Sequence, residues 1–164
     1  MNLKSPAFRK NHPIPREFSQ EGRNISPALE WSDVPAETKS FALICEDPDA
    51  PGDEPFVHWL IYNIPLDVRS LPQEIPRELK LQTPIRADQG KNSAGEIGYV
   101  GPLPPIGHGV HHYIFRLYAL DTPPGLRAGI SDPDELLESI DEHVIDAAQL
   151  VGTYVRTGEK LRSA

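Results

Sequence analysis

Histidine, tyrosine and aspartate residues stand directly beside loops of this sequence that are rich in glycine and proline. His111 and Tyr113 follow the stretch GYVGPLPPIGHGV, which occupies residues 98–110. His58 comes shortly after the loop DPDAPGDEP, which begins at Asp47. Histidine and tyrosine donate hydrogen bonds, and a nearby aspartate fixes the tautomer of a histidine and favours its charged form. Together these residue types predict a binding site for an anion.

The loop before His111 is expected to form one wall of that site. Glycines such as Gly101 let backbone N–H groups approach a ligand closely, and successive N–H groups can surround an anion. Prolines stiffen the loop, so less conformational entropy is lost on binding. We therefore expect a rigid wall with exposed amides.

Two predicted strands are expected to deliver the site residues. Side chains alternate between the faces of a strand, so His111 and Tyr113 share a face. By the same alternation His58 is expected to share a face with Leu60 and Tyr62. The histidines and the tyrosine then meet where the strand ends converge. The alternative is that both histidines are ordinary strand residues satisfied by their neighbours, because histidine is often partly buried.

Motifs for catalysis or metal binding are missing from the sequence. It has no G-x-S-x-G, no H-E-x-x-H and no phosphate-loop lysine motif. A metal site needs His58, His111 and a carboxylate to converge, and the ligand types alone do not favour this. We expect Asp47 to orient His58, and we expect no metal, no cofactor and no catalysis. A hydrolase that uses His58 and Asp47 is the enzymatic alternative.

Composition and charge restrict the class of protein. The chain has 164 residues and a net charge of -8, which suits one domain over residues 1–164 and disfavours nucleic acid as a partner. Cys45 is the single cysteine, so no internal disulfide can form. No stretch approaches the roughly 20 apolar residues of a membrane-spanning helix. The expected location is the cytoplasm.

The pattern of apolar residues predicts a mainly β fold. Residues 40–46, 56–65 and 111–120 read as strands, because they are rich in β-branched and aromatic residues. One helix is expected at about residues 132–151, with a proline in its first turn and an apolar stripe at helical spacing. Strands followed by one late helix favour a β-sandwich.

Several long motifs resemble the phosphatidylethanolamine-binding protein family, which includes the Raf kinase inhibitor proteins. They are DPDAP, GYVGPLPPIGHGVHHYIFRLYAL, GRNISPALEW and EHVIDAAQLVGTYVR, and the last two are similar to the bacterial and archaeal YbhB/YbcL branch. The resemblance covers about residues 23–156. It implies an antiparallel β-sandwich with Greek-key-type connections, a helix near the C-terminus, and a cis bond between Ala50 and Pro51. It assigns a pocket for phosphate-bearing or other anionic groups to Asp47, His58, Gly101, Pro105, His111 and Tyr113. It places His108 at the rim of that pocket, because this loop position varies in the family.

The function that this resemblance implies is non-catalytic binding of a small anionic or phosphorylated ligand, such as a phospholipid headgroup, in a regulatory role. Because the family includes inhibitors of kinases and of serine proteases, the alternative is a protein inhibitor that uses its exposed loops. The expected partners are therefore the small ligand, a protease or kinase, or a second copy of the chain.

Overall fold

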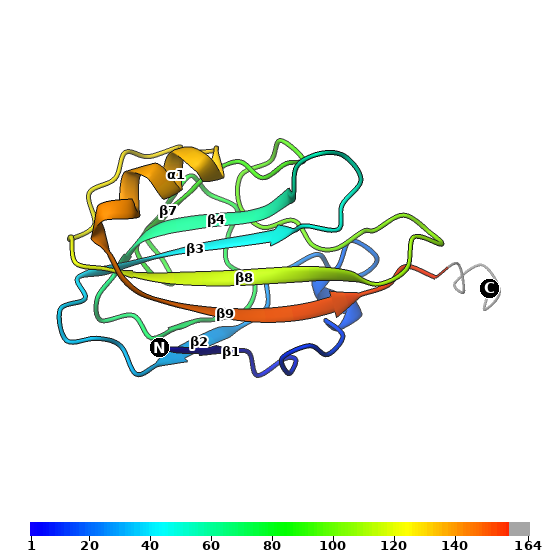
Figure 1. Ribbon diagram of the computed structural model, residues 1–164, viewed down its shortest axis with the longest axis horizontal. Helices are drawn as coiled ribbons and strands as arrows, with labels where there is room; N and C mark the ends of the chain where they lie inside the picture. Colours follow the sequence, from blue (N-terminus) through cyan, green and yellow to red (C-terminus); the bar gives the residue numbers. More distant parts are fainter. Residues whose placement is uncertain (158–164) are drawn as a thin grey trace.

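The computed structural model describes residues 1–157, which form two β-sheets and a short helix (Figure 1). The large sheet has the strand order β6-β7-β4-β3-β8-β9 and the small sheet has the order β1-β2-β5. All of their strand pairs are antiparallel. The strands are β1 (Asn2–Lys4), β2 (Leu29–Ser32), β3 (Ser40–Asp47), β4 (Phe56–Pro65), β5 (Ser70–Leu71), β6 (Lys80–Leu81), β7 (Ala87–Gln89), β8 (His111–Leu120) and β9 (Val144–Tyr154). The helical segments are η1 (Arg16–Phe18), α1 (Pro133–Ile140) and η2 (Asp141–His143).

The connections of the large sheet are not those of a simple meander. The chain leaves β7 on one side of the β3–β4 pair and returns as β8 on the other side. This crossing agrees with the predicted sandwich with Greek-key-type connections. It also brings the start of β8 beside the end of β3, which matters for the site.

Both faces of β3 are buried because a different layer covers each one. On one face, Leu43 and Cys45 pack in a core that includes Leu3 and Trp31 of the small sheet. On the other face, Ala42, Ile44 and their neighbours on β4 pack against Leu136 and Ile140 of α1. Figure 1 shows α1 and the strands β1 and β2 on opposite sides of the large sheet. This burial on two faces explains why β3 is almost continuously apolar.

The three long predicted strands are confirmed almost to the residue as β3, β4 and β8. Their signal is strong because each combines β-branched or aromatic residues with burial on at least one face. The short strands of the small sheet were not predicted. Two to four residues carry too little periodicity to be recognised.

The predicted helix over residues 132–151 is too long. Asp132 caps the helix by accepting a hydrogen bond from the Asp134 N–H at 2.9 Å, but α1 ends at Ile140. Residues 144–154 instead form β9, which pairs with β8 along its whole length. Alanines and alternating polar residues are compatible with either structure, and pairing with a neighbouring strand decides between them. No helix within residues 1–157 is long and apolar enough to cross a membrane.

The predicted cis bond is also in the wrong place. Within residues 1–157 the cis peptide bond joins Thr83 to Pro84, and the bond between Ala50 and Pro51 is trans.

Candidate functional site

A cavity of about 160 Å³ opens where β3 ends and where β4 and β8 begin. Asp47, His58, His111 and Tyr113, four of the six predicted site residues, line it. The other lining residues are Gln20, Ala50, Pro51, Phe56, Leu103 and Pro104. The cavity therefore lies between the two proline-rich loops that the sequence singles out.

A β-bulge in β4 sets the direction of His58. The strand register pairs Cys45 with Trp59 but Glu46 with Val57, so His58 is an extra residue on its strand. A bulge bends the strand and interrupts the alternation of side chains. It therefore separates the direction of His58 from that of the residues that follow it.

The prediction that His58 shares a face with Leu60 and Tyr62 is consequently wrong. Leu60 and Tyr62 pack on the α1 side of the large sheet. His58 instead lies edge-on to the ring of Tyr113, with 5.0 Å between ring centroids, and Tyr113 belongs to the core between the two sheets. The bulge is what brings His58 into the same cavity as Tyr113.

Asp47 orients His111, and the prediction that it orients His58 is wrong. The Nδ1–H of His111 donates to Oδ2 of Asp47 at 2.6 Å, and the two residues are only 1% and 3% exposed. The other carboxylate oxygen, Oδ1, accepts from the backbone N–H of Asp49 at 2.8 Å. Asp47 therefore uses both oxygens to hold the protein itself, and it fixes the tautomer of His111.

His58 is a neutral hydrogen-bond acceptor at physiological pH. Its Nδ1–H donates to the carbonyl oxygen of Val100 at 2.6 Å, and burial lowers its pKa to about 4. The remaining nitrogen, Nε2, makes no hydrogen bond within residues 1–157. This ring therefore offers a lone pair to the cavity, where the sequence suggested a donor.

Tyr113 supplies a donor. Burial, and then the negative charge of Asp47, raise the pKa of its phenol well above the usual value, so the hydroxyl stays protonated. Its oxygen has no hydrogen-bond partner among residues 1–157. The phenol is thus available to a ligand that accepts a hydrogen bond.

Gly101 does not line the cavity. Its N–H donates to Oδ1 of Asn24 at 2.7 Å, and its carbonyl oxygen accepts from Nε2 of Gln20 at 3.0 Å. A Cβ at this position would lie 2.1 Å from the carbonyl oxygen of Phe18. Gly101 is needed for close packing of the loop against the N-terminal segment, so its amide is not exposed as we expected.

Pro105 is exposed and does not line the cavity, whose lining includes Pro104 instead. The carbonyl oxygen of Pro105 accepts from the backbone N–H of His108 at 3.1 Å, which tightens the tip of the loop. The lining proline is therefore one residue earlier in the chain than the resemblance implied.

His108 takes part in the site more directly than its predicted place at the rim suggests. Its Nδ1 lies 2.6 Å from Nε2 of His111. Asp47, His111 and His108 therefore form a linear chain of hydrogen bonds that runs from the interior to the surface of the loop. Among residues 1–157 no three His, Cys, Asp or Glu side chains are placed to hold a metal ion.

Sequence reasoning missed other lining residues for two different reasons. Phe56 begins the strand of His58, and its ring centroid lies 4.7 Å from that of His58, so the strand position was a usable signal. Gln20 comes from a turn-rich segment far away in the chain, and no local pattern indicates its place.

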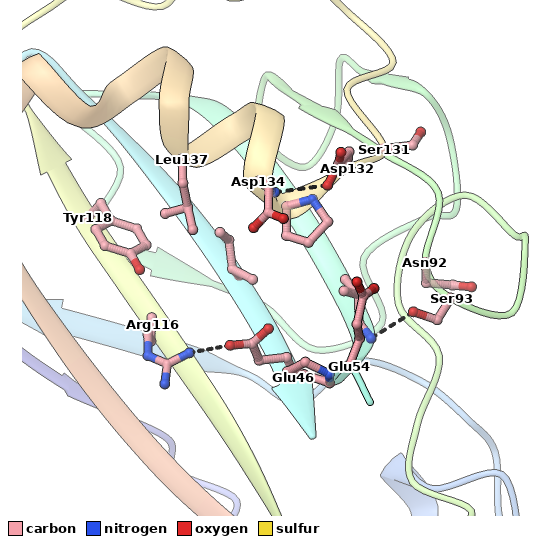
Figure 2. Close-up of a pocket in the computed structure, with 14 residues that line it drawn as sticks. Glu46, Glu54, Asn92, Ser93, Arg116, Tyr118, Ser131, Asp132, Asp134 and Leu137 are labelled. Carbon is pink, nitrogen blue, oxygen red and sulfur yellow. Dashed lines mark hydrogen bonds and ion pairs between the residues drawn. The ribbon is translucent and has the colours of Figure 1, made fainter. Parts of the chain in front are cut away.

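A larger depression of about 380 Å³ lies on the other face of the large sheet, beside α1 (Figure 2). Its acidic side chains are Glu46, Glu54, Asp132 and Asp134. Among residues 1–157 one cationic side chain, Arg116, lines it, and this side chain is paired with Glu46. The excess of negative charge disfavours an anion here, so the smaller cavity is the better candidate for the predicted ligand.

Comparisons with known proteins agree with the geometry. The sequence model of the phosphatidylethanolamine-binding proteins matches residues 4–155. The UPF0098 protein of Methanothermobacter thermautotrophicus is 48% identical over 156 residues, which are 95% of this chain and 99% of that protein. A solved homologue from Chlamydia trachomatis is 42% identical with a TM-score of 0.84, over 94% of this chain and 97% of its own. Escherichia coli YbcL is 32% identical with a TM-score of 0.87, over 95% of this chain and 98% of its own. This chain belongs to the phosphatidylethanolamine-binding protein family.

Proposed function

We propose that this protein binds a small anionic or phosphorylated ligand, such as a phospholipid headgroup, in the cavity at Asp47 and His111, and that it catalyses no reaction there. One observation carries the proposal. His111 is buried and held through Nδ1 by a carboxylate, so a ligand can reach this ring only at Nε2, the nitrogen that contacts His108 when no ligand is bound. When that ring is protonated, Nε2–H donates to an anion and Asp47 stabilises the positive charge.

The other polar groups of the cavity define the ligand more closely. Tyr113 donates a hydrogen bond, whereas neutral His58 can only accept one. The matching ligand has acceptor oxygens and at least one hydrogen of its own. Phosphate monoesters meet this need, because their second pKa is about 6 and a protonated form is present near neutral pH, and in an ethanolamine headgroup the ammonium group supplies the hydrogen.

The set of lining residues supports binding rather than catalysis. Among the described residues, those that line the cavity include no serine, threonine, cysteine or lysine side chain. Among the lining groups that could still act as nucleophiles, the phenol of Tyr113 stays protonated and both carboxylate oxygens of Asp47 already accept hydrogen bonds. The simplest hydrolase at this site would use water as its nucleophile.

The test is a titration with inorganic phosphate, phosphoethanolamine and sulfate near pH 6.5, followed by NMR. We expect phosphate compounds to bind with dissociation constants between about 1 μM and 1 mM, as few contacts allow. The signals of His58, His111 and Tyr113 should shift. Sulfate has the same shape but carries no proton at this pH, so it should bind more weakly than phosphate.

Two outcomes contradict the proposal. Shifts confined to exposed lysines would show only non-specific attraction of an anion. Equal affinity for sulfate and phosphate would show that His58 does not act as an acceptor. Replacing Tyr113 by Phe removes only a hydroxyl, so it should weaken phosphate binding while the fold is kept.

A second candidate function is inhibition of a protease or kinase through the loop before β8. Three apolar side chains of this loop are exposed: Leu103 at 38%, Ile106 at 54% and Val110 at 55%. Exposed apolar groups beside a pocket are typical of surfaces that contact a partner. Assays against purified serine proteases and protein kinases separate the two functions. Ile106→Asp should abolish inhibition while phosphate binding stays unchanged.

A further inference from the structure

The nitrogen through which His111 would bind an anion already has a partner inside the protein. His108 Nδ1 lies 2.6 Å from His111 Nε2, and the centroids of the two rings are 4.8 Å apart with 53° between their planes. The opposite nitrogen of His111 is held by Asp47. A ligand that approaches His111 must therefore compete with the side chain of His108.

The backbone around His108 allows the ring to leave. Gly107 and Gly109 flank it with φ angles of +80° and +84°, and a Cβ at either position would have nothing within 4 Å. Glycine adopts both positive and negative φ at little cost, so rotation at these two positions can swing the ring outward. The buried Pro104 and the strand that begins at His111 need not move.

The number of protons on the two rings decides whether the hydrogen bond between His108 and His111 can form. In the neutral pair, His111 donates through Nδ1 to Asp47, so its Nε2 accepts from the Nδ1–H of His108. If His111 gains one proton, its Nε2–H donates to His108 Nδ1, so the hydrogen bond persists with donor and acceptor exchanged. With a second proton, both nitrogens carry hydrogen, no acceptor is left, and two positive charges face each other. The contact is therefore lost only when both rings are protonated.

We propose that His108 is an internal occupant of the ligand site, which a bound anion displaces and which protonation of the histidine pair releases. The inference rests on the proposed function, because it takes His111 as the anion-binding group. Since the anion requires N–H at His111 Nε2, binding takes up a proton. The affinity should rise as the pH falls through the range in which histidines titrate.

The carboxylates that face the pair strengthen this dependence. Asp47, on β3, accepts directly from His111. Asp49, in the loop after β3, accepts from Nδ1 of His112 at 2.7 Å, and this hydrogen bond lowers the pKa of Asp49. Asp49 thus stays ionised in the histidine range, and a carboxylate beside the pair favours protonated rings.

Two further titratable groups near the pair, His58 and Tyr113, do not change charge in this range. Burial lowers the pKa of His58, on β4, to about 4, so it stays neutral until the solution is strongly acidic. Tyr113, on β8, keeps its proton because burial raises its pKa. A dependence of phosphate affinity on pH that His108→Ala reduces therefore reports on the histidine pair.

The test compares the protein with its His108→Ala variant in calorimetric titrations with inorganic phosphate at pH 7.5 and 5.5. At pH 7.5 the variant should bind phosphate about fivefold more tightly, because it no longer has one internal hydrogen bond to break. The variant should also gain less affinity than the original protein when the pH is lowered to 5.5.

His143→Ala is the matched control. His143 is paired with Asp121 at 2.9 Å, at the opposite end of β8, and it lies outside the cavity. This variant should bind phosphate like the original protein at both pH values. Equal or weaker binding by His108→Ala at pH 7.5 would overturn the proposal, because His108 would then be neutral or helpful to the ligand.

A second readout does not depend on phosphate. In the ligand-free protein at pH 7.5, ¹⁵N NMR should detect scalar coupling across the hydrogen bond between His108 Nδ1 and His111 Nε2. Absence of this coupling in the original protein would refute the internal occupant even if phosphate binds. If the coupling is present but no variant binds phosphate, the proposed function fails, and displacement by an anion fails with it.

Discussion

The carboxylate of Asp47 and the imidazole of His111 lie 2.6 Å apart in the interior, where they join the end of β3 to the start of β8. These strands are neighbours in the large sheet, but 63 residues of chain separate the two positions. The pair holds the ring of His111 in one tautomer and one direction. The chemistry proposed for the cavity depends on this relationship.

Asp47→Asn should keep the fold and weaken phosphate binding by about tenfold near pH 6.5. A carboxylate close to a histidine stabilises the protonated ring, and the amide offers no such charge. Calorimetric titration between pH 5 and 8 measures the effect. Asp121→Asn makes the same change in the exposed pair with His143 and should leave binding unaltered.

Tighter phosphate binding by Asp47→Asn at every pH would contradict this account. It would mean that Asp47 repels phosphate or receives the ammonium group of a ligand. The sign of the change in affinity therefore decides between an orienting and a repelling carboxylate.

His58 should make the protein less stable in mild acid. Its pKa is about 4 in the folded protein, whereas an unfolded histidine titrates near 6.5. The unfolded chain therefore takes up the proton first, and stability falls as the pH drops from about 6.5 toward 4. Linkage predicts a loss from this group on the order of 2 kcal/mol between pH 8 and pH 5.

Urea unfolding at the two pH values, with His58→Asn as the reference, isolates this contribution. Asparagine can keep a donor toward the carbonyl oxygen of Val100 but does not titrate. The variant should lose less of its unfolding free energy on acidification than the original protein. The same loss in both proteins would show that His58 is protonated in the native state.

Gly101→Ala should be much more harmful than Gly95→Ala. A Cβ at position 101 would lie 2.1 Å from the Phe18 carbonyl oxygen, so the loop and the N-terminal segment must separate, at a cost of about 3 kcal/mol. Gly95 has a φ of +83° but open space around it, which suggests a cost of about 1 kcal/mol. Urea denaturation of both variants measures the difference, and equal costs would refute a packing role for Gly101.

Much of the fold was predictable from local patterns in the sequence. The strands at Ser40, Phe56 and His111 were found because each is long, apolar and bounded by turn residues. The end of the helix was not predictable, because residues 144–154 become a strand only by pairing with β8. Such pairing depends on contacts distant in sequence.

The sequence predicted which residues meet at the candidate site, but not which of them are hydrogen-bonded to one another. Asp47, His58, His111 and Tyr113 do meet at one cavity. The bulge that turns His58 results from the register between β3 and β4, and no residue type at that position predicts a bulge. The partner of Asp47 is likewise set by the position of β8 beside β3. His108 was underestimated because its partner depends on the path of a glycine-flanked loop.

A crystal structure of the protein grown with phosphoethanolamine near pH 6 would show where the ligand binds. We expect phosphate oxygens within hydrogen-bonding distance of His111 Nε2 and of the Tyr113 hydroxyl, with the bond between Asp47 and His111 intact and His108 displaced. A phosphate bound outside the cavity, with His108 still bonded to His111, would contradict it.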